Sequence, residues 1–158
     1  ALIAGLGITH IEVFEKVKVL VISTGNEIKN HYETINPYQH FNSSALFFKM
    51  EKLAEVTLLP IVGDRIEEIK NRINEHYDLI ITTGGVSKGD ADFTTAAFRQ
   101  SGYEIKFSWI AIKPGKPFGF AVKKNKVATL LTGNPLAAVF NYNLFVKPLI
   151  RKMAGCSS

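Results

Sequence analysis

Residues 77–90 read Tyr-Asp-Leu-Ile-Ile-Thr-Thr-Gly-Gly-Val-Ser-Lys-Gly-Asp, and this stretch decides the fold. Its first half is a short apolar run, which is typical of a strand buried on both faces of a sheet. Its second half is a glycine-bearing loop that leaves the strand at its carboxyl end. Ligands of open α/β folds bind at the carboxyl ends of the strands. The stretch therefore predicts a sheet with a binding loop at one edge.

Two further loops follow an apolar run in the same way. Residues 113–117 read Lys-Pro-Gly-Lys-Pro and follow the run 109–112. Residues 132–135 read Thr-Gly-Asn-Pro and follow the run 127–131. If the runs are neighbouring parallel strands, the loops converge at one edge of the sheet. Because glycines let backbone N–H groups approach an anion and lysines add charge, the loops together predict an anion-binding site.

The composition indicates a folded protein with anionic partners. The chain has 158 residues, 46% of them hydrophobic, which is enough for one domain with its own core. Its net charge of +5 favours phosphates and oxyanions, while the scattered Lys and Arg residues predict no nucleic-acid partner. No apolar run reaches the roughly 20 residues of a membrane helix, so we expect no membrane partner. The single Cys156 cannot form an internal disulfide, which fits a cytoplasmic protein.

Strand-like and helix-like segments alternate, which predicts an α/β fold: a three-layer α/β/α sandwich around a mostly parallel sheet. The predicted strands are 17–22, 56–62, 78–82, 105–112, 118–122 and 126–131, the last two forming a small antiparallel hairpin. The predicted helices are 2–6, 45–53, 65–76, 91–101 and a last helix that begins at Pro135 and is kinked by Pro148. We interpret 28–41 as a long loop. Because the chain begins without Met, we expect a single domain, 1–158, of a longer multidomain protein.

The loop in 82–90 and the residues just after it supply two carboxylates. Asp90 precedes a predicted helix, so capping that helix explains it at least as well as ligand binding does. Asp92 is expected one residue into the helix, near its positive end, where a carboxylate stays ionised. An ionised carboxylate beside a phosphate site is a typical Mg²⁺ ligand.

Each loop also has a simpler structural explanation. A proline-braced turn with solvated lysines explains residues 113–117, and ordinary helix capping explains Asn134. Asp64 is expected to cap the helix 65–76, with Glu67 completing a capping box. No catalytic triad is evident, and the four histidines show no zinc-site spacing. The functional interpretation therefore depends on the combination of the loops.

That combination resembles one known family. The motifs are Thr-Gly-Asn-Glu at 24–27, Thr-Thr-Gly-Gly-Val-Ser-Lys-Gly-Asp-Ala-Asp-Phe at 82–93, Lys-Pro-Gly-Lys-Pro-Phe at 113–118 and Gly-Asn-Pro at 133–135. Their order and spacing resemble those of the molybdopterin-binding domain of MoeA-type molybdopterin molybdenumtransferases, whose animal relative is gephyrin. The resemblance runs from about Leu6 to Gly155. The Val-Ser-x-Gly-Asp and Lys-Pro-Gly-Lys-Pro elements favour this branch over the adenylyltransferase and CinA-like branches.

The resemblance implies an enzyme of molybdenum cofactor biosynthesis, a molybdopterin molybdenumtransferase. Such enzymes bind adenylylated molybdopterin, insert molybdate and release AMP with the help of Mg²⁺. It implies catalytic roles for Asp92, Lys113 and Lys116, and metal binding by Asp92 and Glu27. It implies that the cofactor contacts Thr24, Gly25, Thr83, Gly84, Gly85, Val86, Ser87, Gly89, Asp90, Pro114, Gly115, Gly133, Asn134 and Pro135. We also expect a homo-oligomer, because isolated domains of this fold often self-associate.

Two other functions stay open, a non-catalytic module that binds the cofactor or a partner, and a molybdopterin adenylyltransferase of the same fold. Three positions depart from the family's usual residues: Asn26 and His40 each replace an Asp, and Thr132 replaces a Pro. The first two changes remove carboxylates and weaken divalent metal binding, since imidazole is a poor Mg²⁺ ligand. The family enzymes are also longer, with domains that complete the active site of a dimer. We therefore expect ligand binding from this chain, and turnover only together with such domains.

Overall fold

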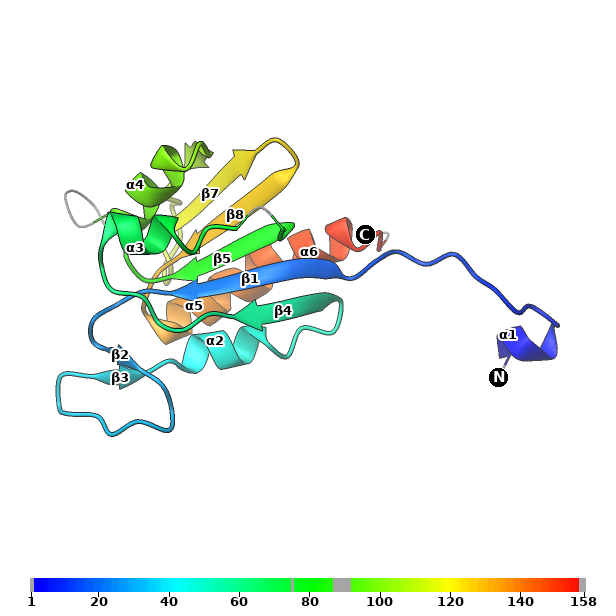
Figure 1. Cartoon of the computed structure of the whole chain (residues 1–158), viewed down its shortest axis with the longest axis horizontal. Helices are drawn as coiled ribbons and strands as arrows, with labels where there is room; N and C mark the ends of the chain where they lie inside the picture. Colours follow the sequence, from blue (N-terminus) through cyan, green and yellow to red (C-terminus); the bar gives the residue numbers. More distant parts are fainter. Residues whose placement is uncertain (1, 75, 87–91, 157–158) are drawn as a thin grey trace.

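A six-stranded sheet forms the middle layer of the molecule (Figure 1). The computed structural model describes residues 2–74, 76–86 and 92–156. In spatial order the strands are β4 (Ala54–Leu58), β1 (Val17–Ser23), β5 (Leu79–Thr83), β8 (Lys126–Leu131), β7 (Phe118–Lys123) and β6 (Glu104–Phe107). The first four are parallel, and β7 and β6 each pair antiparallel with the strand before them. The predicted mostly parallel sheet with an antiparallel hairpin is confirmed.

The central strands end together at one edge. Ser23 of β1 pairs with Thr83 of β5, which in turn pairs with Leu131 of β8. All five residues of β5 are buried, as its apolar, β-branched sequence predicts. Because the three strand ends are in register, the loops after β1, β5 and β8 leave the sheet side by side.

Helices cover both faces of the sheet and give the predicted three layers (Figure 1). On one face lie α2 (Ser43–Phe48), α5 (Pro135–Asn141), the π-helix η1 (Tyr142–Val146) and α6 (Lys147–Met153); on the other lie α3 (Ile66–Lys70) and α4 (Phe93–Gln100). The first face is anchored by Phe48, which stacks on Tyr142 with ring centroids 4.7 Å apart. The second contains Phe98 packed edge-on against Tyr103. Each helical layer thus has its own buried aromatic pair.

The last helix changes turn type just before Pro148, where we predicted a kink. The π-helix η1 ends at Val146, and Pro148 lies in the first turn of α6, which continues directly from it. Tyr142 begins the π-helix, and its hydroxyl donates to Glu51 Oε2 at 2.9 Å. Burial, together with this hydrogen bond, raises the pKa of Tyr142 far above its ordinary value. The hydroxyl therefore stays protonated and keeps α5–η1 tied to the segment after α2.

The predicted strand 105–112 is wrong beyond Phe107. The backbone N–H of Ile110 donates to Lys116 O at 3.0 Å, which closes a turn instead of extending the pairing with β7. The predicted strand 56–62 is displaced, since β4 covers Ala54–Leu58 and only a bridge between Thr24 and Val62 continues it. Apolar runs here predict neither burial nor the end of strand pairing, since Phe107 and Trp109 in the run 105–112 are each 41% exposed.

Two predicted helices are shorter than expected. The helix predicted at 45–53 is α2, which ends at Phe48. The helix predicted at 65–76 is α3, which ends at Lys70. The predicted cap by Asp64 is wrong, because Asp64 Oδ2 instead accepts the N–H of Asn26 at 3.3 Å, and Arg65 occupies the N-cap without a side-chain hydrogen bond. A tertiary contact with the loop after β1 thus replaces the local capping contact.

A second, two-stranded sheet lies within residues 28–41, which we predicted to be a loop. Its strands are β2 (Ile28–Lys29) and β3 (His40–Phe41), paired in parallel. The N–H of His40 donates to Glu27 O at 2.9 Å, and the side chain of Asn42 donates to Ser23 Oγ at 2.9 Å. These bonds hold β3 beside the end of β1. Strands of two residues are too short to produce an alternating pattern, so the sequence could not reveal them.

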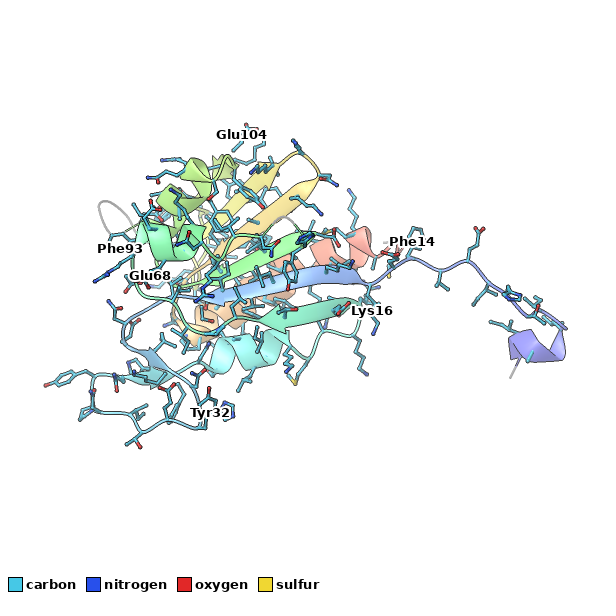
Figure 2. The ribbon with its side chains drawn as sticks, viewed as in Figure 1. Phe14, Lys16, Tyr32, Glu68, Phe93 and Glu104 are labelled. Carbon is cyan, nitrogen blue, oxygen red and sulfur yellow. The ribbon has the colours of Figure 1, made fainter. Side chains whose placement is uncertain are left out.

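The N-terminal residues form an arm that extends from the body (Figure 1). Helix α1 (Leu2–Gly5), predicted at 2–6, lies near its far end, and Gly7 after it has a φ of 72°. Phe14 lies where the arm joins the body (Figure 2), and its ring covers Gly155, where a Cβ would come within 2.5 Å of it. Across the described residues, no helix has both the length and the apolar character needed to span a membrane.

Candidate functional site

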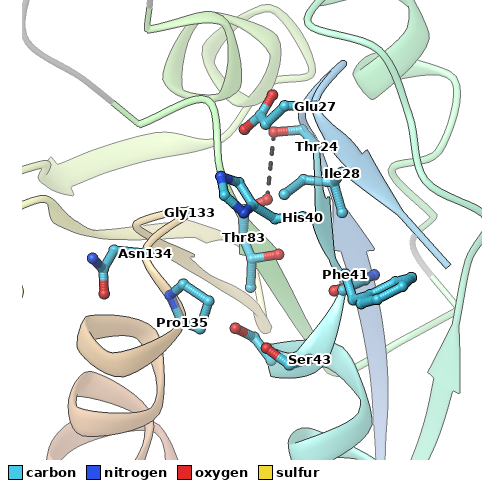
Figure 3. A pocket seen from close by; sticks show the side chains of 12 residues that line it. Thr24, Glu27, Ile28, His40, Phe41, Ser43, Thr83, Gly133, Asn134 and Pro135 are labelled. Carbon is cyan, nitrogen blue, oxygen red and sulfur yellow. Dashed lines mark hydrogen bonds between the residues drawn. The ribbon is translucent and has the colours of Figure 1, made fainter. Parts of the chain in front are cut away.

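A cavity of about 570 Å³ opens at the carboxyl edge of the sheet. Figure 3 shows it between the loop after β8, which carries Asn134 and Pro135, and the segment that carries Phe41 and Ser43. Its lining residues are Thr24, Glu27, Ile28, His40, Phe41, Asn42, Ser43, Ser44, Thr83, Gly133, Asn134 and Pro135. Small-molecule sites commonly measure roughly 300–1,000 Å³. The cavity thus has the size and position of a ligand site in an open α/β fold.

The loop after β1 forms one wall of the cavity. The N–H of buried Thr24 donates to Thr83 O at 2.8 Å, and its hydroxyl donates to the same oxygen at 3.4 Å (Figure 3). Gly25 follows with a φ of 140°, and its N–H donates to Val62 O at 3.2 Å. Of these two predicted binding residues, Thr24 lines the cavity and Gly25 shapes the loop.

Gly84 and Gly85 allow the loop after β5 to pack closely against its neighbours. Their φ angles of 93° and 62° lie in the left-handed region that favours glycine. A Cβ on Gly84 would lie 2.2 Å from Thr24 O, and one on Gly85 would lie 2.3 Å from Thr94 Oγ1. The Thr94 hydroxyl also donates to Gly84 O at 3.0 Å. These glycines therefore allow close packing between the loops after β1 and β5. Their predicted contact with the cofactor stays a prediction.

The other predicted residues near this loop have different positions. Thr83 lines the cavity at the end of β5. Val86 is buried in the core on the α4 side of the sheet, so packing accounts for it. Ser87, Gly89 and Asp90 lie outside the described residues. Their predicted ligand contacts, and the predicted helix cap by Asp90, stay predictions.

Asp92 is the N-cap of α4, and not a residue inside the helix as we predicted. Its Oδ1 accepts the N–H of Thr95 at 3.0 Å, and the helix begins at Phe93. Glu27 lines the cavity, but Asp92 does not. Within the described ranges, no group of three His, Cys, Asp or Glu side chains is placed to hold a metal ion. Metal binding by Asp92 and Glu27 therefore stays a prediction.

The loop after β8 brings three predicted binding residues to the cavity: Gly133, Asn134 and Pro135. Asn134 Oδ1 accepts the N–H of Ala137 at 3.1 Å and caps α5, and Pro135 occupies the first turn. A Cβ on Gly133 would lie 3.4 Å from Gly84 Cα, so this loop touches the loop after β5. The predicted convergence of these two loops is therefore a feature of the structure.

The lysine loop, residues 113–117, approaches the same edge by a route that the sequence does not predict. The segment before it is a turn, and the loop leads into β7, whose first residue, Phe118, pairs with Leu131. Because β7 is antiparallel to β8, its start lies at the carboxyl end of β8. Lys113, Pro114 and Lys116 are exposed and do not line the cavity. The lysines thus border the edge of the sheet without forming a cavity wall.

Asn141 holds the lysine loop in place and was missed by the sequence analysis. It is fully buried at the end of α5, and its Nδ2 donates to Gly115 O at 2.9 Å. Gly115 has a φ of 99°, and a Cβ there would lie 2.5 Å from Asn141 Oδ1. Helix α5 therefore joins two candidate loops, through Asn134 at its start and Asn141 at its end. An amide among the apolar residues of the last helix was the available signal.

Asn141→Ala is expected to destabilise the protein by about 1–3 kcal/mol, because it leaves a buried carbonyl without its donor. Asn143→Ala is the matched control: Asn143 is exposed, and its Nδ2 also donates to a backbone carbonyl, that of Val139, at 2.9 Å. The control should change stability by less than about 0.5 kcal/mol. Urea unfolding measures both values. Equal losses in the two variants would contradict a special role for Asn141.

The segment β2–β3 supplies cavity residues that the sequence analysis did not assign to the site. Ile28, His40 and Phe41 come from these strands, and Ser43 and Ser44 from the start of α2. His40 and Thr83 both line the cavity (Figure 3). The one available signal was the family's usual Asp, which His40 replaces. The departure at His40 thus falls inside the cavity.

The comparisons with known proteins agree with this geometry. The sequence profile of a family described as "Probable molybdopterin binding domain" matches residues 20–152. The chain belongs to this molybdopterin-binding domain family. A protein of Haemophilus influenzae named molybdopterin molybdenumtransferase is 38% identical over 160 residues, which are 98% of this chain and 39% of that protein. The chain therefore spans about two fifths of the length of this relative.

Solved structures of a MoeA protein and a CinA protein also superpose on this chain. A molybdopterin biosynthesis MoeA protein from Pyrococcus horikosii superposes with a TM-score of 0.84 at 32% identity, over 98% of this chain and 39% of that one. A CinA protein from Thermoplasma acidophilum superposes with a TM-score of 0.62 at 18% identity, over 85% of this chain and 98% of that one, which shows the fold alone. This chain is thus more similar to the MoeA structure than to the CinA structure.

Proposed function

We propose that this domain binds adenylylated molybdopterin and supports the insertion of molybdate with release of AMP. The observation that carries the proposal is the cavity of about 570 Å³, which is lined by the loops after β1 and β8 and by the last residue of β5. The hydroxyls of Thr24 and Thr83 donate their protons to Thr83 O and Ser23 Oγ, so their oxygens can accept hydrogen bonds from a polar pterin. The backbone of Gly133 also faces the cavity. The match to the family and to proteins named molybdopterin molybdenumtransferase supports the choice of ligand.

Lys113 and Lys116 supply positive charge for the phosphates or for molybdate. Neither lysine takes part in an ion pair within the described part of the chain. Their charges are therefore not neutralised by neighbouring carboxylates. The net charge of +5 acts in the same direction by attracting anions to the protein.

Mg²⁺ would be held by Glu27, with Asp92 as the second proposed ligand. Glu27 carries the one carboxylate among the described residues that line the cavity. Mg²⁺ commonly takes one or two carboxylates from a protein and completes its shell with substrate phosphates and water. A site with few protein ligands is consistent with this usual coordination of Mg²⁺. When bound, the ion would neutralise charge on the phosphates. Asn26 and His40 add no carboxylate.

The insertion step is tested on the full-length protein by measuring AMP release from adenylylated molybdopterin with and without molybdate. We expect release that depends on molybdate and is lost in the Lys113→Ala/Lys116→Ala variant. Tight binding without release would favour the non-catalytic module instead. Formation of adenylylated molybdopterin from molybdopterin and ATP would favour an adenylyltransferase. We also propose that residues 1–158 act as one domain of a homo-oligomer, which light scattering can check.

A further inference from the structure

Trp109 and Lys116 form a cation–π pair beside the lysine loop. The Nζ atom of Lys116 lies 5.2 Å from the centroid of the Trp109 ring. A cation within about 6 Å of an indole is attracted to the face of the ring. Trp109 is the chain's single tryptophan and is 41% exposed, so packing in the core does not account for it. The indole therefore lies at the surface, where it contacts the Lys116 ammonium.

The backbone around the pair is held from two sides. The N–H of Ile110, next to Trp109, donates to Lys116 O at 3.0 Å. The carbonyl of Gly115, next to Lys116, accepts from the buried Asn141 at 2.9 Å. The backbone that carries the indole and the ammonium is thus held by hydrogen bonds. The contact between the two groups restricts the remaining freedom of the long, flexible Lys116 side chain.

The kind of partner matters for the charge of Lys116. A carboxylate that held this ammonium would also neutralise it and compete with any anionic ligand. An indole attracts the ammonium through its ring quadrupole while the full positive charge is retained. Within the described residues, Lys116 has no carboxylate partner. An ammonium has three N–H donors, so its side away from the ring can bind an oxyanion.

We propose that Trp109 is a positioning residue that holds the Lys116 ammonium ready to bind an oxyanion of phosphate or molybdate type. This inference rests on the proposed function, because Lys116 must contact the anionic substrate for its position to matter. The affinity for the anion increases because the lysine side chain has less mobility to lose on binding.

The test is a double-mutant cycle with Trp109→Ala and Lys116→Ala in the full chain. Calorimetry measures the affinity for pyrophosphate and, separately, for molybdate. Trp109→Ala should weaken binding about 2- to 5-fold, the range that corresponds to an exposed cation–π contact. Trp109→Phe should retain most of the affinity, because its ring also attracts the cation. In the Lys116→Ala background, Trp109→Ala should have no further effect. The probe whose affinity changes identifies the anion that Lys116 holds.

The emission of Trp109 gives a second readout that a purely structural role would not move. Anion binding should change the fluorescence of the wild-type chain and leave that of Lys116→Ala unchanged. An equal loss of affinity from Trp109→Ala in both backgrounds, or no loss in either, would overturn the positioning role while the proposed function stands. If the wild-type chain binds neither anion, the proposed function fails and the inference fails with it.

Discussion

Replacing Gly84 with alanine should lower the free energy of unfolding by about 2–5 kcal/mol, the combined cost of a left-handed alanine and of overpacking. Gly84 has a φ of 93°, and its new Cβ would lie 2.2 Å from Thr24 O. That oxygen belongs to backbone that cannot easily move, because the N–H of Thr24 bonds to Thr83 O at 2.8 Å. The loops after β1 and β5 would have to separate, which would also open the cavity.

Gly102→Ala is the matched control for this prediction. Gly102 has a similar φ of 82°, but the nearest atom to its Cβ would be Lys123 Cε at 3.4 Å, near the end of a flexible side chain. The free energy of unfolding of this variant should therefore fall only by the cost of placing alanine in the left-handed conformation, about 1–2 kcal/mol. Urea unfolding of both variants gives the difference. Equal losses would show that the contact between Gly84 and Thr24 contributes nothing beyond backbone strain.

Replacing Lys113 or Lys116 with alanine should weaken binding of adenylylated molybdopterin about tenfold or more, because each change removes a hydrogen bond to a charged group. Thermal stability should change little, since both side chains are exposed; loss of the Trp109 contact could cost Lys116→Ala about 0.5–1 kcal/mol. Calorimetry at two salt concentrations measures the affinities.

Lys52→Ala serves as the control for the lysine variants, because Lys52 is an exposed lysine outside the candidate loops. It should leave the affinity within about twofold, since distant surface charges are screened. If all three variants bind alike, the lysines are turn residues only, and other groups hold the anion.

The sheet and its binding edge could be predicted because they follow from local pattern. The apolar run of β5 and the glycines after it indicate a buried strand and a sharp turn whatever the rest of the chain does. The lysine loop shows the limit of this reasoning. It lies at the predicted edge, but it follows a turn and leads into the antiparallel strand β7, and it does not follow the predicted strand 105–112.

Residues whose roles depend on tertiary contacts could not be assigned from the sequence. Asn141 looks like one more residue of a helix until the fold places it against Gly115. His40 enters the cavity because two-residue strands pair across a long loop, which no periodicity reveals. Asp64 has the sequence context of a helix cap, yet it bonds to Asn26 instead. In each case a contact between distant segments decided the role of the side chain.

The central claim is that the cavity at the carboxyl edge binds a phosphorylated pterin. Its most direct test is titration calorimetry of this chain with adenylylated molybdopterin under reducing conditions. We predict saturable binding at one site per chain, which pyrophosphate weakens by competition and which Lys113→Ala/Lys116→Ala largely removes. Absence of measurable binding by a chain that unfolds cooperatively, and is therefore folded, would contradict the account.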